Sequence, residues 1–288
     1  MGIELNDPIL GAFNMLGRIL VGLVFVAGPI ETVFVDGFEV RSQRQHQTVT
    51  ALQAHAAIAD SMHVGLTSAV IRWAWLMLVQ RLNVSLPVGQ EILVHTACAG
   101  MVNAGFLAAE RALKGLQLTA VLSVASEKCS LRRDALRMQY PNAMLVADAA
   151  MDVAYSRHSH IFIASWPCKT YSSAQVDSSV PRKVWEERAW YNTRLICYIV
   201  QQACLQPSGP PNIIVLENVK GLFLRKRCRP YLKFILRFLT TTPHTWFNQV
   251  VCPRIHLGAQ CMRPRLFFVG IIRRGIGEAR REAQDQGA

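Results

Sequence analysis

The chain has 288 residues, of which 51% are hydrophobic and 17% are charged, so it can bury a large core and is not of the disordered class. Its net charge of +12 favours a polyanionic partner, either nucleic acid or an anionic membrane surface. The eight cysteines occur without any Cys-x-x-Cys pair, which argues against a zinc ribbon, predicts no metal site and is typical of a reduced, intracellular protein.

An apolar segment near the start of the chain, residues 19–30, is too short to be a membrane span. It has about a dozen residues, whereas a helix that crosses a bilayer needs roughly 20. We therefore interpret it as a buried strand or a short core helix and expect no membrane partner. The expected location is the cytoplasm of a prokaryote or of a phage-infected cell, or the nucleus of a eukaryote.

From about residue 90 the sequence alternates short β-rich runs with helical stretches. Residues 50–83 are helical in character, and further helices are predicted over 104–116 and 185–205. Several predicted strands are continuous apolar runs, as is usual for strands buried on both faces. The predicted strands are 91–96, 118–126, 143–147, 160–165, 212–218, 247–255 and 265–272. This alternation predicts an α/β fold with a Rossmann-like, doubly wound, mostly parallel sheet.

The carboxyl ends of the first three predicted strands carry candidate cofactor-binding residues, because ligands of doubly wound sheets bind at these ends. After the first strand, Ala99, Gly100 and Met101 form a small-residue turn that allows close approach of a ligand. Glu127 follows the second strand, where an acid commonly binds ribose hydroxyls, although it could equally start a helix. Asp148 follows the third strand and could bind an adenine amino group or cap a helix.

The ends of the later strands carry residues suited to catalysis. Cys168 lies just beyond the fourth strand, and Glu217 and Asn218 end the fifth. Arg263 and Arg265 precede the last strand, and their alternate spacing places both guanidinium groups on one face. Taken singly, each of these residues could also be an inert thiol, a helix cap or a surface charge.

In this order the motifs resemble those of the cytosine-5 DNA methyltransferases. They run "ACAGM", Glu127, Asp148, "PCKTYS", "ENV" and "RPR", and the match covers about residues 92–270. The resemblance implies the sheet of S-adenosylmethionine-dependent methyltransferases, S-adenosylmethionine as the cofactor and duplex DNA with a flipped cytosine as the substrate.

The resemblance also implies a role for each matched residue. Cys168 would add to carbon 6 of cytosine, which makes carbon 5 able to accept a methyl group. Glu217, followed by Asn218 in the same motif, would bind ring nitrogen 3, and Arg265, supported by Arg263, would bind the base oxygen and the adjoining phosphate. The residues expected at the cofactor are Ala99, Gly100, Met101, Glu127, Lys128, Asp148, Ala149 and Pro167.

The sequence departs from the family pattern in the arrangement of its ends. The family continues past the arginines into a recognition domain and a closing helix, whereas only 18 residues follow Gly270 here. Upstream, "VGLTSAV" at 64–70 resembles the closing motif, with Leu66 in place of asparagine, which suggests a circular permutation or an ordinary amphipathic helix.

The expected organisation therefore has four parts. Residues 1–50 are a possible remnant of the recognition region, 51–85 a relocated closing segment, 86–272 the catalytic domain and 273–288 a solvated tail. The basic stretch 224–233 could contact phosphates or form a solvated helix face. A second polypeptide could supply target recognition. A tRNA cytosine-5 methyltransferase, or a catalytically silent or split homologue that binds cofactor or a partner, remain the alternatives.

Overall fold

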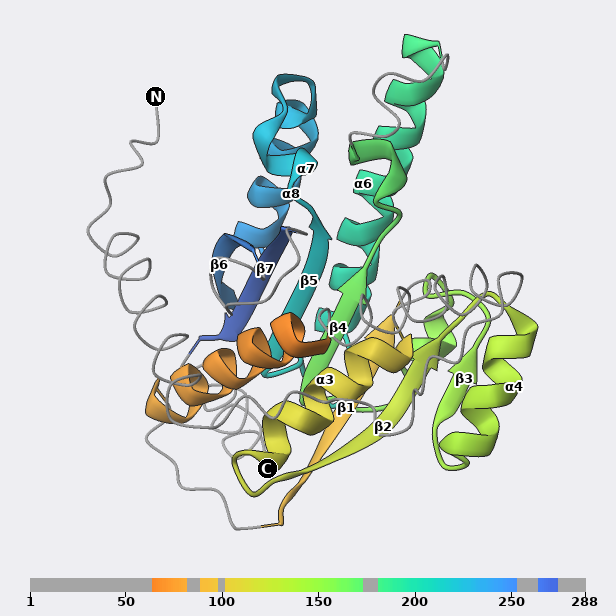
Figure 1. The fold of residues 1–288 in the computed structure, drawn as a ribbon, viewed down its shortest axis with the longest axis vertical. Helices are drawn as coiled ribbons and strands as arrows, with labels where there is room; N and C mark the ends of the chain where they lie inside the picture. Colours follow the sequence, from red (N-terminus) through yellow and green to blue (C-terminus); the bar gives the residue numbers. More distant parts are fainter. Residues whose placement is uncertain (1–63, 82–88, 98–101, 173–180, 253–263, 274–288) are drawn as a thin grey trace, which may run out of the picture.

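The computed structural model describes residues 64–81, 89–97, 102–172, 181–252 and 264–273. The predicted segments 1–50 and 19–30 lie outside the described residues. The strands and helices named below fall within these ranges, and Figure 1 shows their arrangement.

The first half of the sheet follows the predicted alternation of strand and helix. A helix over residues 64–81 precedes β1 (Glu91–Ala97), which α3 (Val102–Lys114) connects to β2 (Thr119–Ser126). Next come α4 (Ser130–Gln139), the short β3 (Met144–Val146) and the 3₁₀ turn η1 (Asp152–Tyr155). The strand β4 (Ile161–Ser165) then leads into the 3₁₀ turn η2 (Lys169–Tyr171).

The second half contains the longest helix and the antiparallel edge of the sheet. The helix α6 (Arg182–Cys204) leads to β5 (Ile213–Val219), which is followed by α7 (Gly221–Leu224) and the 3₁₀ turn η3 (Lys226–Cys228). The helix α8 (Arg229–Thr240) precedes β6 (His244–Val251) and β7 (Arg265–Ile272). The sequence prediction placed the sixth strand at 247–255; the strand begins earlier, at His244, and ends at Val251.

The seven strands form one mixed sheet in the order β3-β2-β1-β4-β5-β7-β6. The pairs among β1 to β5 are parallel, and β7 runs antiparallel to both β5 and β6. The predicted Rossmann-like, mostly parallel α/β fold is therefore confirmed. In such a sheet the carboxyl ends of β1, β2, β4 and β5 meet at one edge, where the candidate residues were expected.

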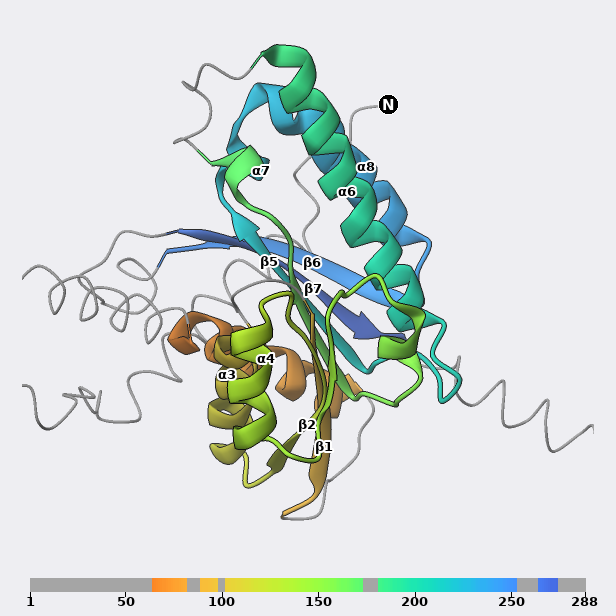
Figure 2. The same cartoon turned by 90° about the vertical axis from the view of Figure 1, so that its right-hand side faces the viewer.

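Helices cover both faces of this sheet, as Figure 2 shows with the sheet seen nearly edge-on. Ile213 and Val215 of β5 belong to the apolar cluster formed with α3 and the helix 64–81, whereas Ile214 and Leu216 belong to the cluster formed with α6 and α8. This alternation of fully buried residues explains why the strand is a continuous apolar run. It also assigns Glu217, two residues beyond Val215, to the face covered by the helix 64–81.

Within the described part of the chain, no helix is both long enough and apolar enough to cross a membrane.

Candidate active site

A buried ion pair joins the ends of two neighbouring strands. Arg265 Nε of β7 lies 2.7 Å from Glu217 Oε1 of β5, and the two side chains are only 12% and 9% exposed. In the antiparallel register Arg265 is opposite Val219, so it lies on the same face as Glu217 and diagonally across from it. Two predicted catalytic residues, 48 positions apart in the sequence, are thus in direct contact.

The loop that carries Cys168 begins beside this pair. Ser165, the last residue of β4, is in register with Glu217, and Asn218 Nδ2 donates a 3.2 Å hydrogen bond to the carbonyl oxygen of Trp166. Asn218 is fully buried, so its side chain ties the end of β5 to the start of the loop. Two residues further on, Cys168 is exposed at the N-terminus of η2.

Exposure distinguishes Cys168 from most of the other described thiols. Burial raises the pKa of Cys197 and of Cys204 to about 12, so both remain protonated and unreactive at neutral pH. Among the described cysteines, Cys129 and Cys168 are the exposed ones. Of these two, Cys168 is the one that follows the strand end next to Glu217.

Hydrogen bonds to α6 fix the loop after Cys168. Trp185 Nε1 donates to the carbonyl oxygen of Thr170 at 2.7 Å, and the fully buried hydroxyl of Tyr171 donates to the carbonyl oxygen of Ala189 at 3.0 Å. Burial raises the pKa of Tyr171 to about 12, so this phenol keeps its proton as a structural donor. The loop is therefore held by α6 on the side away from Glu217.

A close backbone approach holds the same loop against the turn after β5. A Cβ atom added at Gly221 would overlap the carbonyl oxygen of Tyr171, so only glycine fits at this position. Arg225 Nη1 also donates to the carbonyl oxygen of Ser172 at 3.2 Å. The loop with Cys168 and the strand end with Glu217 are thereby packed as one unit.

Two buried threonines complete the surroundings of Glu217, and neither was among the predicted site residues. Thr67, Thr96, Ser165 and Glu217 contribute to the lining of a cavity of about 10 Å³. The Oγ1 atoms of Thr67 and Thr96 have no hydrogen-bond partner among the described residues, although the two residues are only 1% and 2% exposed. Buried hydroxyls without partners are costly, so they are candidates for ligand contacts. The signal that the sequence offered for these two site residues is a small polar side chain, near the end of a strand for Thr96 and near the start of a helix for Thr67.

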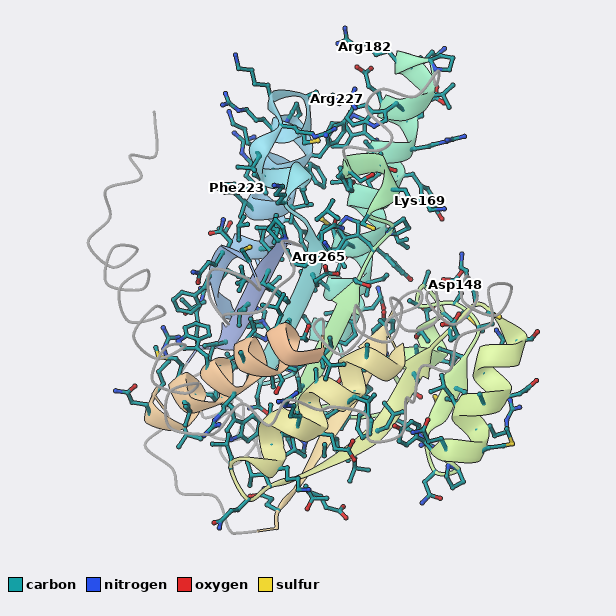
Figure 3. All side chains as sticks on the ribbon, viewed as in Figure 1. Asp148, Lys169, Arg182, Phe223, Arg227 and Arg265 are labelled. Atoms are coloured by element: carbon teal, nitrogen blue, oxygen red, sulfur yellow. The ribbon has the colours of Figure 1, made fainter. Side chains whose placement is uncertain are left out.

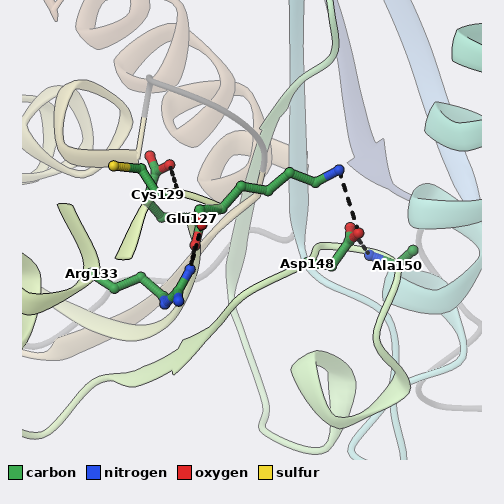
Figure 4. Close-up of polar contacts among 6 residues, drawn as sticks. Glu127, Cys129, Arg133, Asp148 and Ala150 are labelled. Carbon is green, nitrogen blue, oxygen red and sulfur yellow. Dashed lines mark hydrogen bonds and ion pairs between the residues drawn. The ribbon is translucent and has the colours of Figure 1, made fainter. Parts of the chain in front are cut away.

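Three of the predicted cofactor residues, Glu127, Lys128 and Asp148, lie at the ends of β2 and β3, and Figure 4 draws their contacts. The backbone N–H of Glu127 donates to the carbonyl oxygen of Val146, and Glu127 Oε1 accepts from the backbone N–H of Cys129 at 2.9 Å. Lys128 Nζ lies 3.5 Å from Asp148 Oδ2. The carboxylates of Glu127 and Asp148 therefore lie on adjacent strand ends, as expected.

Two of the remaining predicted residues, Ala149 and Pro167, lie in different surroundings. Ala149 is buried and its carbonyl oxygen accepts from the hydroxyl of Tyr155 at 2.7 Å. Pro167 is exposed and borders a hollow against α6. Four of the predicted site residues lie outside the described ranges, namely Ala99, Gly100, Met101 and Arg263.

A basic stretch follows the Glu217 strand. Residues 220–240 contain seven lysines and arginines and no aspartate or glutamate. The same stretch includes the exposed aromatic side chains of Phe223 and Phe234. Arg227 is held over the ring of Trp185, 4.4 Å from its centroid, which joins the stretch to α6. Figure 3 shows Phe223, Arg227 and Lys169 beyond Arg265, where α6, α7 and α8 extend past the sheet.

No protein-family model matches the sequence, and no curated protein is similar enough to count as a relative. Solved structures do match. Three of these structures are described as methyltransferases. One is a prophage-encoded protein of E. coli described as a DNA modification methyltransferase, with 16% identity and a TM-score of 0.44, covering 63% of this chain and 47% of that chain.

Two further matches carry the methyltransferase name. The S. pombe Dnmt2 methyltransferase has 11% identity and a TM-score of 0.43, covering 64% of this chain and 49% of that chain. The Entamoeba histolytica methyltransferase EhMeth has 11% identity and a TM-score of 0.46, covering 64% of this chain and 53% of that one. This chain thus spans about half the length of the structures it matches. The roles argued below rest on this chain's own side chains.

Proposed function

We propose that the chain transfers a methyl group from S-adenosylmethionine to carbon 5 of cytosine in DNA through a covalent adduct of Cys168. The observation that carries the proposal is the buried ion pair of Glu217 and Arg265, 2.7 Å apart, beside the strand end that leads into the exposed Cys168. A nucleophile, a carboxyl group and a guanidinium group at one strand edge are the three groups that this reaction needs.

Each group has a defined part in the chemistry. The Cys168 thiolate forms the Sγ–C6 bond, which removes the aromaticity of the ring and shifts an electron pair toward carbon 5. Glu217 holds the proton that ring nitrogen 3 gains, and Arg265 binds the base oxygen and, with Arg263, the adjoining phosphate. When carbon 5 accepts the methyl group, the electron pair of the broken S–CH₃ bond stays on the sulfur of the methyl donor. The carbon 5 proton then leaves to water, and its electron pair forms the C5=C6 bond as the Sγ–C6 bond breaks and its pair returns to the sulfur of Cys168. Ring nitrogen 3 gives its proton back to Glu217.

The residues at the strand ends fit S-adenosylmethionine. The cofactor supplies an electrophilic methyl group when it is bound. Glu127 would bind its ribose hydroxyls and Asp148 its adenine amino group, with Lys128, Ala149 and Pro167 alongside. The buried hydroxyls of Thr96 and Ser126, near the ends of β1 and β2, have no hydrogen-bond partner in the described part of the chain, which supports a polar ligand at this edge.

Nucleic acid is the substrate that the charge of the chain supports. The seven cations between residues 220 and 240 face no carboxylate within their own stretch, and phosphate contacts of this kind position a duplex without reading its sequence. The target cytosine must leave the duplex to reach Cys168, so base flipping is part of the proposal. A second polypeptide, or residues 1–50, would supply target recognition.

We further infer that the helix over residues 64–81 is a relocated closing segment of a permuted catalytic domain. Its Thr67 belongs to the "VGLTSAV" stretch and lines the same small cavity as Thr96 and Glu217. A segment that precedes β1 by about 25 residues therefore contributes to the candidate site, as a closing helix would. The division of the chain at residues 50, 85 and 272 is part of this inference.

The experiment is transfer of a radiolabelled methyl group to duplex DNA and to tRNA in parallel. We expect incorporation into DNA by the wild-type chain and by Cys129→Ala, which removes the other exposed thiol of the described residues, and none by Cys168→Ala. Incorporation into tRNA alone would replace DNA as the substrate. S-adenosylmethionine binding without transfer to either would favour a silent or split homologue.

A further inference from the structure

A hollow of about 460 Å³ lies between the Cys168 loop and α6, and of its described lining only Pro167 has a part in the proposed reaction. Lys169 and Thr170 line it from the loop, and Arg188, Tyr191 and Asn192 line it from α6. Its volume lies in the range of sites that bind small organic ligands. Because α6 packs on the opposite face of the sheet from the helix 64–81, this hollow is separate from the cavity at Glu217.

The walls of the hollow are held rigidly. Asn192 Nδ2 donates to Thr170 Oγ1 at 3.1 Å, and Trp185 Nε1 donates to the carbonyl oxygen of Thr170 at 2.7 Å. Asn192 and Thr170 are 6% and 5% exposed. A ligand here would meet a preformed wall, so it would not have to order the loop on binding.

The side chains that remain accessible in the hollow match the parts of a nucleotide. The ring of Tyr191 is 64% exposed and offers a face on which a base can stack. Lys169 and Arg188 are exposed cations that can bind a phosphate. Glu187 is the one carboxylate among the described lining residues and would repel a bare phosphate, but it can accept a hydrogen bond from the amino group of a base.

We propose that this hollow binds an unpaired nucleotide of the substrate strand next to the target cytosine. Its base would stack on Tyr191 with an amino group donating to Glu187, and its phosphate would lie between Lys169 and Arg188. The inference rests on the proposed function, because the hollow is bounded by the residues on either side of Cys168. A strand that places a flipped cytosine at Cys168 would pass this hollow with an adjoining nucleotide.

The test is fluorescence anisotropy of a labelled single-stranded oligonucleotide with one cytosine. Tyr191→Ala should weaken binding by about ten-fold or more, the effect of losing one base stack. The matched control is Tyr198→Ala, two turns further along α6, where the hydroxyl donates to Asp152 Oδ1 outside the hollow. We expect Tyr198→Ala to bind within two-fold of the wild type. Thermal unfolding of both variants at the wild-type temperature would establish that they fold.

A second arm identifies the contact. Oligonucleotides with an abasic site are made at each position beside the cytosine. At one position the loss of the base should weaken wild-type binding as much as Tyr191→Ala does, and Tyr191→Ala should then cause no further loss. Equal binding by wild type and Tyr191→Ala on the intact strand, or an equal loss in Tyr198→Ala, would overturn the inference. Adduct formation at Cys168 in the same samples judges the proposed function separately.

Discussion

Arg265→Met removes one partner of the Glu217 carboxylate, which is mostly buried. Arg265 and Glu217 are 12% and 9% exposed with 2.7 Å between Nε and Oε1, so solvent screens their interaction little. Breaking such a buried pair from one side typically costs about 3–5 kcal/mol, because the remaining charge stays buried and loses its counter-ion. In a chain of this size we expect the melting temperature of Arg265→Met to fall by roughly 10 °C.

The double-mutant cycle isolates the pair from other effects of the substitutions. Glu217→Gln should cost about as much as Arg265→Met, and the double variant should be more stable than the sum of the two losses by at least about 2 kcal/mol. Urea unfolding of the four proteins measures this coupling. The control is the pair of Arg182 and Glu186 on α6, which has the same 2.7 Å separation but side chains that are 91% and 42% exposed.

We expect the coupling of the exposed control pair to lie far below that of the buried pair, since surface ion pairs contribute little. Single substitutions at 217 and 265 that cost less than about 1 kcal/mol, with additive effects, would refute the reasoning. In that case the pair would not be a buried, mutually dependent unit.

Three further predictions follow from other contacts. Gly221→Ala should destabilise the fold by about 2–4 kcal/mol in urea unfolding, because its Cβ would overlap the backbone oxygen of Tyr171; wild-type stability would contradict this. Thr67→Val should leave stability unchanged or raise it by about 1 kcal/mol, while calorimetry shows about ten-fold weaker S-adenosylmethionine binding; unchanged affinity would exclude the helix from the site. Burial lowers the pKa of His95 to about 3 and of His244 to about 4. Below pH 6.5 these two histidines therefore bind protons in the unfolded chain but stay neutral in the folded chain. Stability should therefore fall between pH 6.5 and pH 5 by about 1.4 kcal/mol per pH unit for each histidine, and a flat profile would argue against their burial.

The fold was predictable because burial on both faces leaves a clear pattern in the sequence. Ile213 to Leu216 are all fully buried, and their uninterrupted apolar run marked the strand. The carboxyl ends of such strands gather at one edge, so Glu217 and Cys168 were predicted to lie near each other without coordinates. The sixth strand was predicted three residues late at its start because His244 and Thr245 are polar, although His244 is fully buried and bonded to the carbonyl oxygen of Pro211.

The contacts that complete the site were not predictable, because they join segments that are distant in the sequence. Thr67 precedes Glu217 by 150 positions, and no local pattern indicates that they share a cavity. The close approach of Gly221 to Tyr171 depends on how two loops pack, so neither residue is marked by its neighbours in the sequence. The hollow against α6 arises in the same way, from a loop and a helix face that meet only in the folded chain.

The most direct test of the proposed reaction is mass spectrometry of the protein after incubation with S-adenosylmethionine and duplex DNA containing 5-fluorocytosine. Fluorine replaces the proton that must leave carbon 5, so an adduct cannot break down. We expect a protein–DNA species whose cross-linked peptide carries the modification on Cys168, which forms with Cys129→Ala and is absent with Cys168→Ala. An adduct that persists in Cys168→Ala, or methyl transfer to cytosine by that variant, would contradict the account.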